Sequence, residues 1–341
     1  MRRFVPVVTL LVLCLASPAL AQFETATVVG TVRDSSGAVV ADAKVTLTNT
    51  QTGVSAERMS DANGSFEFFT VRIGTYVLSA EKDGFSIALV ENVQVTVGAR
   101  QRVELTMAVG QVSETVEVSA RAVLLQTDSS ERSQIITGEQ TRALPLNGRE
   151  YSQLALLSPG VRVSPLAFGG REGSFNVNGL RSTFNNFLID GVDNNAYGTS
   201  NQGFSNQVMQ PSPDSVEEFK VVTNNMSAEY GRAAGATINV AYASGTNQIH
   251  GSGWEFARRT GLNATGFFRP PDGVKPPFER DQYGVVIGGP ILRNKAFFFA
   301  DFEGFRQTRG QTASTTIANL AQRNGILTVD VRNPLTGQVY A

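Results

Sequence analysis

Short runs of alternating apolar and polar residues recur along most of this chain, and glycine, asparagine or aspartate bounds each run. A period of two is the pattern of a strand with one buried face, and the bounding residues are those that form turns. Helical periodicity is rare, and no later apolar run approaches the roughly 18 residues of a membrane-spanning helix. The chain of 341 residues is therefore predicted to be mainly β, with more than one domain.

The N-terminus has the features of a secretory signal. Two arginines precede an apolar stretch over residues 4–16, and the small-x-small pattern Ala-Leu-Ala follows it. Residues 1–21 are therefore predicted to be a cleaved signal peptide. The only cysteine, Cys14, lies inside this segment, which excludes disulfides and cysteine-ligated metals from the mature chain. The net charge of −1 gives no indication of a nucleic-acid partner.

The first predicted domain covers residues 25–109. Turn signals such as DSSG, DANG and KDG separate its alternating runs, which describes a small sandwich of two packed sheets. The predicted strands are 28–32, 44–49, 65–69, 75–81, 92–97 and 102–107. The segments GTVRDSSGAVVADAKVTLTN, SDANGSFEF and GTYVLSAEKDGF resemble the carboxypeptidase regulatory-like domain. That resemblance implies a transthyretin-like β-sandwich, whose general shape is shared with carbohydrate-binding modules.

The sequence gives no indication of catalysis. Zinc hydrolysis needs a cluster of His and Glu ligands, whereas the single histidine, His250, lies in an alternating run typical of a strand face. The GxSxG pattern of serine hydrolases is absent. A calcium loop at Asp190, Asp193, Asn194 and Asn195 lacks the EF-hand spacing, so a plain turn is favoured there. We expect no enzyme activity, cofactor or metal.

A linker over residues 110–125 contains SETVEVSA, which can be extended but has no obvious partner strand. Such a segment can pair by strand addition to an exposed sheet edge. It is similar to the TonB box of outer-membrane receptors, and this similarity implies the periplasmic domain of TonB as a partner. A final strand or a simple linker is the alternative interpretation. The residues that carry the similarity are Glu114, Thr115, Val116, Glu117 and Val118.

Residues 126–245 are predicted to form a compact α/β unit. The stretch 149–161 places Tyr151, Leu154 and Leu157 at helical spacing and stops at Pro-Gly, while strand-like runs with Asn-Gly and Asp-Gly turns follow it. The blocks LPLNGREYSQLALLSPGV, FNVNGLRSTFNNFLIDGVDNN, SVEEFKVVTNNMSAEYGRAAGATINVAYASGTNQIHGS and VIGGPILRNKAFFFADFEGFR appear in this order. Together they resemble the plug and the first barrel strands of Oar-like TonB-dependent receptors.

This resemblance explains the polar composition of residues 175–195. A plug that folds inside a water-filled barrel is expected to have polar sides and only a thin apolar core, here residues 187–189. The resemblance places the characteristic turns of the plug at Gly179, Arg181, Asp190 and Gly191. We also consider an ion pair between Arg181 and Asp190 as a hypothesis.

Residues 246–341 are predicted to begin a transmembrane β-barrel. GSGWEFARR and KAFFFADFEGF alternate apolar with polar residues, QYGVVIGGPI forms a hairpin with the second run, and residues 306–341 are expected to be a long polar loop. Transporters of this architecture have barrels of about 22 strands. We therefore expect an incomplete barrel, a truncated N-terminal part of a receptor that does not transport by itself.

The resulting functional prediction is a TonB-dependent outer-membrane receptor with its sandwich on the periplasmic side. Its expected partners are TonB, outer-membrane lipid around a complete barrel, and an extracellular peptide, protein or carbohydrate. The alternative is an exported carbohydrate-binding or adhesive protein built on the sandwich. That alternative needs an exposed aromatic platform, although core packing accounts for most of the available side chains. The candidates are Phe66, Phe68, Phe69, Tyr76 and Phe85.

Overall fold

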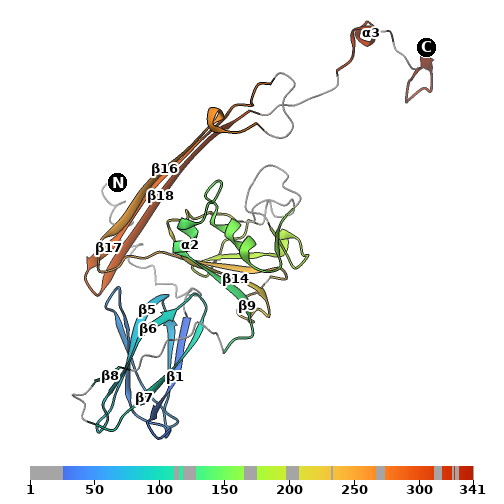
Figure 1. The fold of residues 1–341 in the computed structure, drawn as a ribbon. Coiled ribbons are helices and arrows are strands. Elements are labelled where there is room, and N and C mark those ends of the chain that lie inside the picture. Colours follow the sequence, from blue (N-terminus) through green and yellow to red (C-terminus); the bar gives the residue numbers. More distant parts are fainter. Residues whose placement is uncertain are drawn as a thin grey trace, which may run out of the picture. The chain divides into compact units, whose positions relative to one another are not determined.

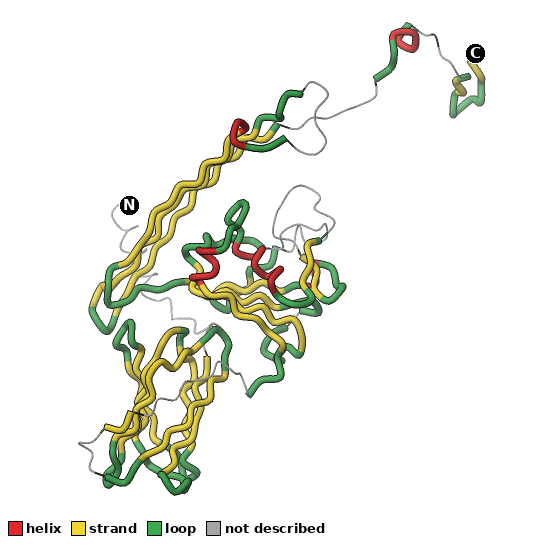
Figure 2. The backbone as a smooth tube through the Cα atoms, in the orientation of Figure 1, coloured by secondary structure: helices red, strands yellow, loops and turns green. Residues whose placement is uncertain are grey.

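The computed structural model describes residues 26–110, 115–117, 128–164, 175–196, 207–231, 233–265, 273–310, 317–324, 326 and 330–340. The predicted signal peptide lies outside these residues. Strands dominate the described part of the chain (Figure 2). By its internal contacts the chain divides into two compact units, one of residues 1–253 with 284–303 and one of residues 254–283 with 304–341.

The N-terminal domain is a β-sandwich of two sheets (Figure 1). One sheet has the order β4-β1-β7 and the other the order β3-β2-β5-β6-β8. The strands are β1 (Ala26–Asp34), β2 (Lys44–Asn49), β3 (Ser55–Met59), β4 (Ser65–Val71), β5 (Gly74–Glu81), β6 (Ile87–Val95), β7 (Arg100–Met107) and β8 (Thr115–Glu117). The six predicted strands correspond to β1, β2, β4, β5, β6 and β7. The sequence analysis missed β3, because all five of its residues are exposed and no alternation marks it.

The core of the sandwich is apolar and follows from alternation along each strand. In β7, every second residue is buried from Gln101 to Met107, and β2 buries Val45 and Leu47 in the same way. The inward side chains of both sheets meet in one cluster that includes Phe66, Phe68, Leu78 and Leu105. The expectation of a two-sheet sandwich is therefore confirmed.

The second domain is a five-stranded sheet of order β13-β12-β15-β14-β9 with short helices and a small separate strand pair. Its elements are β9 (Arg132–Thr137), α2 (Gly138–Ala143), the 3-10 helix η1 (Tyr151–Leu157), β10 (Val161–Val163), β11 (Phe175–Val177), the 3-10 helix η2 (Ser182–Phe184), β12 (Asn186–Ile189), β13 (Val192–Asp193), β14 (Val216–Asn224) and β15 (Thr237–Tyr242). β12 pairs in parallel with β15, which is antiparallel to β14.

The thin apolar core expected within residues 175–195 is part of a larger core. Phe187 and Ile189 are buried as predicted, but they belong to a larger cluster that also takes in Phe219 and Ile238 of the central strands. Tyr151 packs its ring edge-on against Phe219, with ring centroids 5.3 Å apart. The core is larger because β14 and β15 are buried on both faces, so their apolar residues run together instead of alternating.

The predicted helix over residues 149–161 is a shorter 3-10 helix. Tyr151 and Leu154 are buried, whereas Leu157 is 55% exposed and does not share their buried face. The helix ends before Pro159-Gly160, as predicted, and Gly160 takes a positive φ of 86°. The sequence analysis missed α2, although Thr137 and Gln140 form a reciprocal capping box at its start.

Three long strands follow, in the order β16-β17-β18: β16 (His250–Arg259), β17 (Phe278–Leu292) and β18 (Ala296–Arg309). The three predicted strands correspond to them. On β18, Phe298 and Phe302 lie on one face by strand alternation, and both side chains are exposed.

The expectation of a polar loop over 306–341 was wrong at its start, because β18 continues to Arg309. The 3-10 helix η4 (Thr260–Leu262) lies between β16 and β17. After β18 come the short helix α3 (Leu320–Arg323) and two short antiparallel strands, β19 (Val331–Arg332) and β20 (Val339–Tyr340). Within the described residues, no helix combines the length and the apolar character needed to cross a bilayer.

Candidate functional site

The candidate coupling segment, residues 114–118, is described for its three central residues, which form strand β8. β8 pairs in parallel with β6, with Thr115 opposite Ile87 and Glu117 opposite Leu89. The sequence analysis found no partner strand for this segment, and the structure corrects that expectation. The partner was missed because parallel pairing joins positions that no hairpin turn connects.

The chain that leads to this segment is held against the start of β6. Ser86 donates its backbone N–H to Ala108 at 2.9 Å, and Gly110 donates to Gly84 at 3.3 Å. Phe85 and Val109 form an antiparallel bridge between these two bonds. The sandwich therefore fixes the backbone immediately before the coupling segment.

Asp128 is the first residue described after the coupling segment, and its carboxylate binds β7 of the sandwich. Arg102 donates two charge-assisted hydrogen bonds to it, from Nε at 3.1 Å and from Nη2 at 2.8 Å. This forked arrangement is the strongest geometry open to a guanidinium and a carboxylate. The sandwich thus contacts the chain on both sides of residues 118–127.

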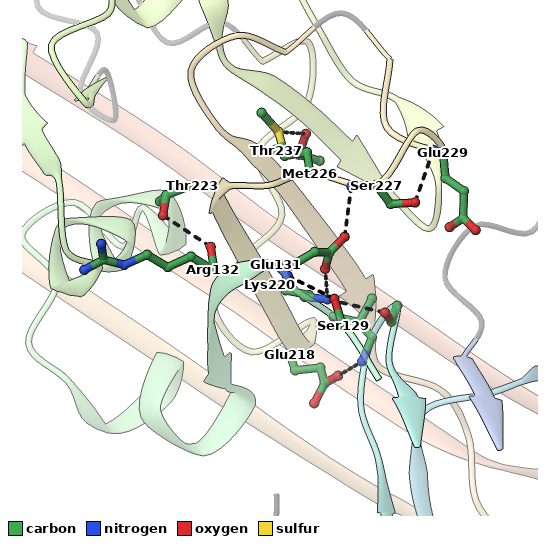
Figure 3. A network of polar contacts seen from close by, with 12 residues as sticks. Ser129, Glu131, Arg132, Glu218, Lys220, Thr223, Met226, Ser227, Glu229 and Thr237 are labelled. Atoms are coloured by element: carbon green, nitrogen blue, oxygen red, sulfur yellow. Dashed lines mark hydrogen bonds and ion pairs between the residues drawn. The ribbon is translucent and has the colours of Figure 1, made fainter. Parts of the chain in front are cut away.

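A buried ion pair joins the residue before β9 to the neighbouring strand β14 of the plug-like domain (Figure 3). Lys220 of β14 is fully buried, and its Nζ lies 2.8 Å from Oε2 of Glu131, directly before β9. The other oxygen of Glu131 accepts the backbone N–H of Ser227 at 3.2 Å. Lys220 also donates to the carbonyl of Gly98 at 3.3 Å. Both charges are therefore hydrogen-bonded, as burial requires.

Glu218 lies two residues before Lys220 on β14 and is also buried. It accepts a hydrogen bond from the backbone N–H of Val97. Burial raises the pKa of Glu218 to about 7, and the hydrogen bond from Val97 opposes this rise. The carboxyl therefore titrates close to neutral pH.

The predicted Asp-Gly turn lies between β12 and β13. Asp190 and Gly191 have positive φ values of 47° and 73°, which is the two-residue hairpin geometry that favours this sequence. Oδ1 of Asp190 also accepts the backbone N–H of Tyr242 at 2.9 Å, which ties the turn to β15. Gly179 has a φ of 82°, and Arg181 is exposed. The ion pair between Arg181 and Asp190 remains a prediction.

Asparagine side chains complete the backbone pairing around this turn. The amide of Asn185 donates to the carbonyl of Phe175 at 2.8 Å and accepts the N–H of Ala236 at 3.2 Å. Asn195 accepts the N–H of Phe187 at 3.0 Å and donates to Asn186 at 2.7 Å. The abundance of asparagine in residues 175–195 therefore has a structural cause, since these amides satisfy buried polar groups.

Comparisons with known proteins follow the same domain order. The carboxypeptidase regulatory-like domain matches residues 27–108, the TonB-dependent receptor plug domain matches residues 126–238, and an outer membrane beta barrel domain matches residues 241–341. The TonB-dependent transporter Oar of Myxococcus xanthus is 25% identical over 296 residues, which is 82% of this chain and 26% of Oar. Over most of its length the chain is similar to the TonB-dependent transporter family. The matches to the barrel and plug domains imply a location in the outer membrane.

Parts of two solved structures are also similar to parts of this chain. The outer membrane transporter YddB of Escherichia coli is 17% identical, with a TM-score of 0.42 over 51% of this chain and 26% of YddB. The siderophore receptor PirA of Acinetobacter baumannii is 19% identical, with a TM-score of 0.37 over 50% of this chain and 24% of PirA. The chain thus spans about a quarter of the length of each relative.

The proteins that the chain matches are transporters and receptors. Among the described residues, no group of three or more His, Cys, Asp or Glu side chains is arranged to hold a metal ion. His250 lies at the exposed start of β16, where Nδ1 is 3.0 Å from the carbonyl oxygen of Gln248. Asp193 caps its own turn by accepting the backbone N–H of Asn195 at 2.8 Å.

The aromatic platform of the alternative function does not form on the sandwich. Phe66, Phe68 and Tyr76 are buried in the core, and Phe85 packs against it. Phe69 is 60% exposed and alone among the five candidates is available to a ligand. Core packing therefore accounts for four of the five, and the glycan-binding alternative loses the feature on which it depended.

Proposed function

We propose that this chain carries the energy-coupling and gating parts of an outer-membrane transporter. TonB grips residues 114–118 from the periplasm, where the sandwich lies after export by the signal peptide. Force on this segment reaches the plug, which then opens a path for a ligand bound outside. The ligand is a peptide, protein or carbohydrate, and lipid surrounds the barrel.

The observation that carries this proposal is the position of the coupling segment relative to the matched plug. Residues 115–117 form an extended strand, and the plug match begins at residue 126, directly after the linker. An extended peptide can bind by strand addition, in which backbone hydrogen bonds supply the affinity. Among the residues that the structure describes after this strand, Asp128 and Glu131 are the first that form ion pairs, so tension on the strand would act on these two contacts.

In the plug, we propose that Gly179, Arg181, Asp190 and Gly191 hold the turns that keep the closed shape. The positive φ values at Gly179 and Gly191 are conformations that side chains disfavour. The bond from Tyr242 to Asp190 connects the second turn to the central sheet.

Binding to TonB tests the assignment directly. A peptide of residues 111–121 should bind the purified periplasmic domain of TonB, and a scrambled peptide of the same composition should not. In the whole mature chain, Val116→Pro should weaken TonB binding by about tenfold or more, because proline cannot donate its share of the strand hydrogen bonds. The matched control, Val123→Pro in the same linker, should bind as the parent does. Equal losses in both variants would contradict the assignment of residues 114–118.

A further inference from the structure

Strand β14 of the plug is buried on a face that the apolar core of the plug does not cover. Phe219 and Val221 belong to that core. By strand alternation, Glu218, Lys220 and Val222 lie on the opposite face. All three are nevertheless buried, and Lys220 and Val222 are buried fully. Other parts of the chain therefore cover this second face of β14.

One of these parts is a turn of the sandwich. Residues 96–99, here called the crossover turn, connect β6 of one sandwich sheet to β7 of the other. Ala99 donates its backbone N–H to the carbonyl of Thr96 at 3.1 Å, and its own carbonyl accepts the N–H of Thr27 at 2.9 Å. These bonds fix the turn to the sandwich. The sandwich and the plug belong to the same compact unit.

The crossover turn meets the second face of β14 with its backbone groups (Figure 3). The N–H of Val97 donates to the carboxyl of Glu218. The carbonyl of Gly98 accepts from Nζ of Lys220 at 3.3 Å. The acidic side chain thus faces a backbone donor, and the basic side chain faces a backbone acceptor. The polar groups of the turn and of the strand are therefore complementary.

The side chains of the crossover turn allow a close approach to the plug. Val97 is fully buried, yet among the described residues neither the sandwich cluster nor the plug cluster includes it. Gly98 has a φ of 59°, and a Cβ atom there would lie 2.6 Å from Oη of Tyr230. A side chain at position 98 would therefore strain the turn and push Tyr230 away.

We propose that the crossover turn is a docking contact through which the sandwich covers the charged face of the plug sheet. The docked turn supplies hydrogen bonds that Glu218 and Lys220 need once they are buried. Movement of the sandwich away from the plug would break both bonds and let water reach the two side chains. The use of this contact to keep the plug closed rests on the proposed function, whereas the contact itself does not.

A substitution at Gly98 tests whether the turn covers Lys220. Asparagine tolerates a positive φ better than most residues with a Cβ, so Gly98→Asn adds bulk at the contact with little strain in the turn. In the full mature chain, an amine-reactive ester should label Lys220 about tenfold faster in this variant than in the parent, because undocking exposes the amine. Peptide mass spectrometry measures the labelling. Lys44, whose side chain is 45% exposed, is the internal standard.

The matched control for this substitution is Gly84→Asn. Gly84 lies in another turn of the sandwich and has a φ of 86°, but a Cβ atom there meets no atom within 4 Å. The control therefore makes the same backbone change without disturbing a contact, and Lys220 should react as slowly as in the parent. The proposal is overturned if Lys220 stays equally slow in Gly98→Asn, or if both variants accelerate its labelling equally.

A change on the plug side tests the same contact without altering the turn. Glu218→Ala removes the acceptor of the Val97 N–H. Hydrogen exchange of that amide, followed in peptides that contain residues 96–99, should become about tenfold faster, and exchange around Gly84 should not change. Glu217→Ala alters the exposed neighbour and should leave both turns as they are in the parent. Unchanged exchange of the Val97 amide in Glu218→Ala would overturn the docking contact.

Neither measurement uses TonB, so the docking contact and the proposed function fail separately. If the variants undock the turn but the peptide of residues 111–121 does not bind TonB, the docking contact stands and the coupling assignment is wrong. If the peptide binds TonB but Lys220 of the parent reacts as fast as Lys44, the coupling assignment stands and the docking contact is wrong.

Discussion

The sandwich and the plug both contain a five-stranded sheet, but they differ in what the sheet buries. Among residues 26–110, the buried polar side chains are the uncharged Asn49, Ser60, Ser86 and Gln101. The plug buries Lys220 and Glu218 on one strand, together with amides such as Asn185 and Asn239. Both have an apolar cluster of their own. The difference therefore lies in the buried polar groups, not in the presence of a core.

This difference indicates which domain loses stability more readily when conditions or single contacts change. The stability of an apolar core depends little on pH and falls mainly when the packing of its side chains is disturbed. A buried ion pair contributes little net stability, but the loss of one partner leaves an uncompensated charge. The ion pair between Lys220 and Glu131 adds such a contact between β14 and the residue before β9, beside the backbone pairing of the two strands. The plug is therefore expected to be more sensitive than the sandwich to the loss of a single polar contact.

The largest expected effect comes from removing one partner of this ion pair. Glu131→Ala leaves the ammonium of Lys220 buried without its carboxylate and should destabilise the plug by about 3–5 kcal/mol. Hydrogen exchange measured by mass spectrometry should show faster exchange in peptides from β14, and unchanged exchange in peptides from β5.

The sandwich offers a matched control for this change. Lys44 and Glu57 are also 2.8 Å apart, but their side chains are 45% and 58% exposed. Glu57→Ala should therefore leave exchange in the sandwich unchanged, because water screens exposed pairs. An equal response to both substitutions would remove the proposed contrast between the two domains.

A second contrast is the response to pH. The pKa of Glu218 rises from 4.5 to about 7 on folding, so the folded plug favours the protonated carboxyl. The stabilisation is complete below pH about 4.5 and is lost as the pH rises through about 7, in total about 3 kcal/mol. Urea unfolding across this window should show a falling midpoint for the plug.

Glu218→Gln should remove this slope while keeping an acceptor for the N–H of Val97. The neighbouring Glu217 is exposed, so Glu217→Gln is the control that should keep the slope. A parent protein whose plug stability does not change between these pH values would show that Glu218 titrates normally.

Local patterns in the sequence predict much of the fold. Alternation located β2 over its full length, and the Asp-Gly pair located the turn between β12 and β13. The missed elements lack such patterns. β3 is exposed on both faces, and the partner of β8 depends on parallel pairing between separate segments. The capping box Thr-x-x-Gln before α2 was a readable signal that the sequence analysis overlooked.

The buried ion pair of the plug was not predictable in the same way. Lys220 lies in EEFKVVTNN, where alternation suggests an outward lysine, and Glu131 lies in a polar stretch that gives no sign of a buried charge. Their meeting depends on the pairing of β14 with β9, in which Lys220 lies opposite Ile135. Only the sheet order brings the two charges together, because 89 positions separate them in the chain.

The smallest of the three expected effects is a loss of stability in the sandwich. Gly30 lies on β1 opposite Val103 of β7 and next to the ring of Phe66. A Cβ atom at this position would lie 1.8 Å from the carbonyl oxygen of Val103 and 2.5 Å from the Phe66 ring, so the backbone of two strands must shift. Gly30→Ala should therefore destabilise the sandwich by about 1–3 kcal/mol through overpacking.

The measurement is again regional hydrogen exchange, with faster exchange expected in β1 and β7 and no change in β14. Gly231→Ala is the control, because a Cβ there meets no atom within 4 Å. If Gly30→Ala accelerated exchange in β14 as strongly as in β1, the sandwich and the plug would unfold as one unit. The apolar sandwich would then lose stability together with the charged plug, and the contrast between the two domains would not hold.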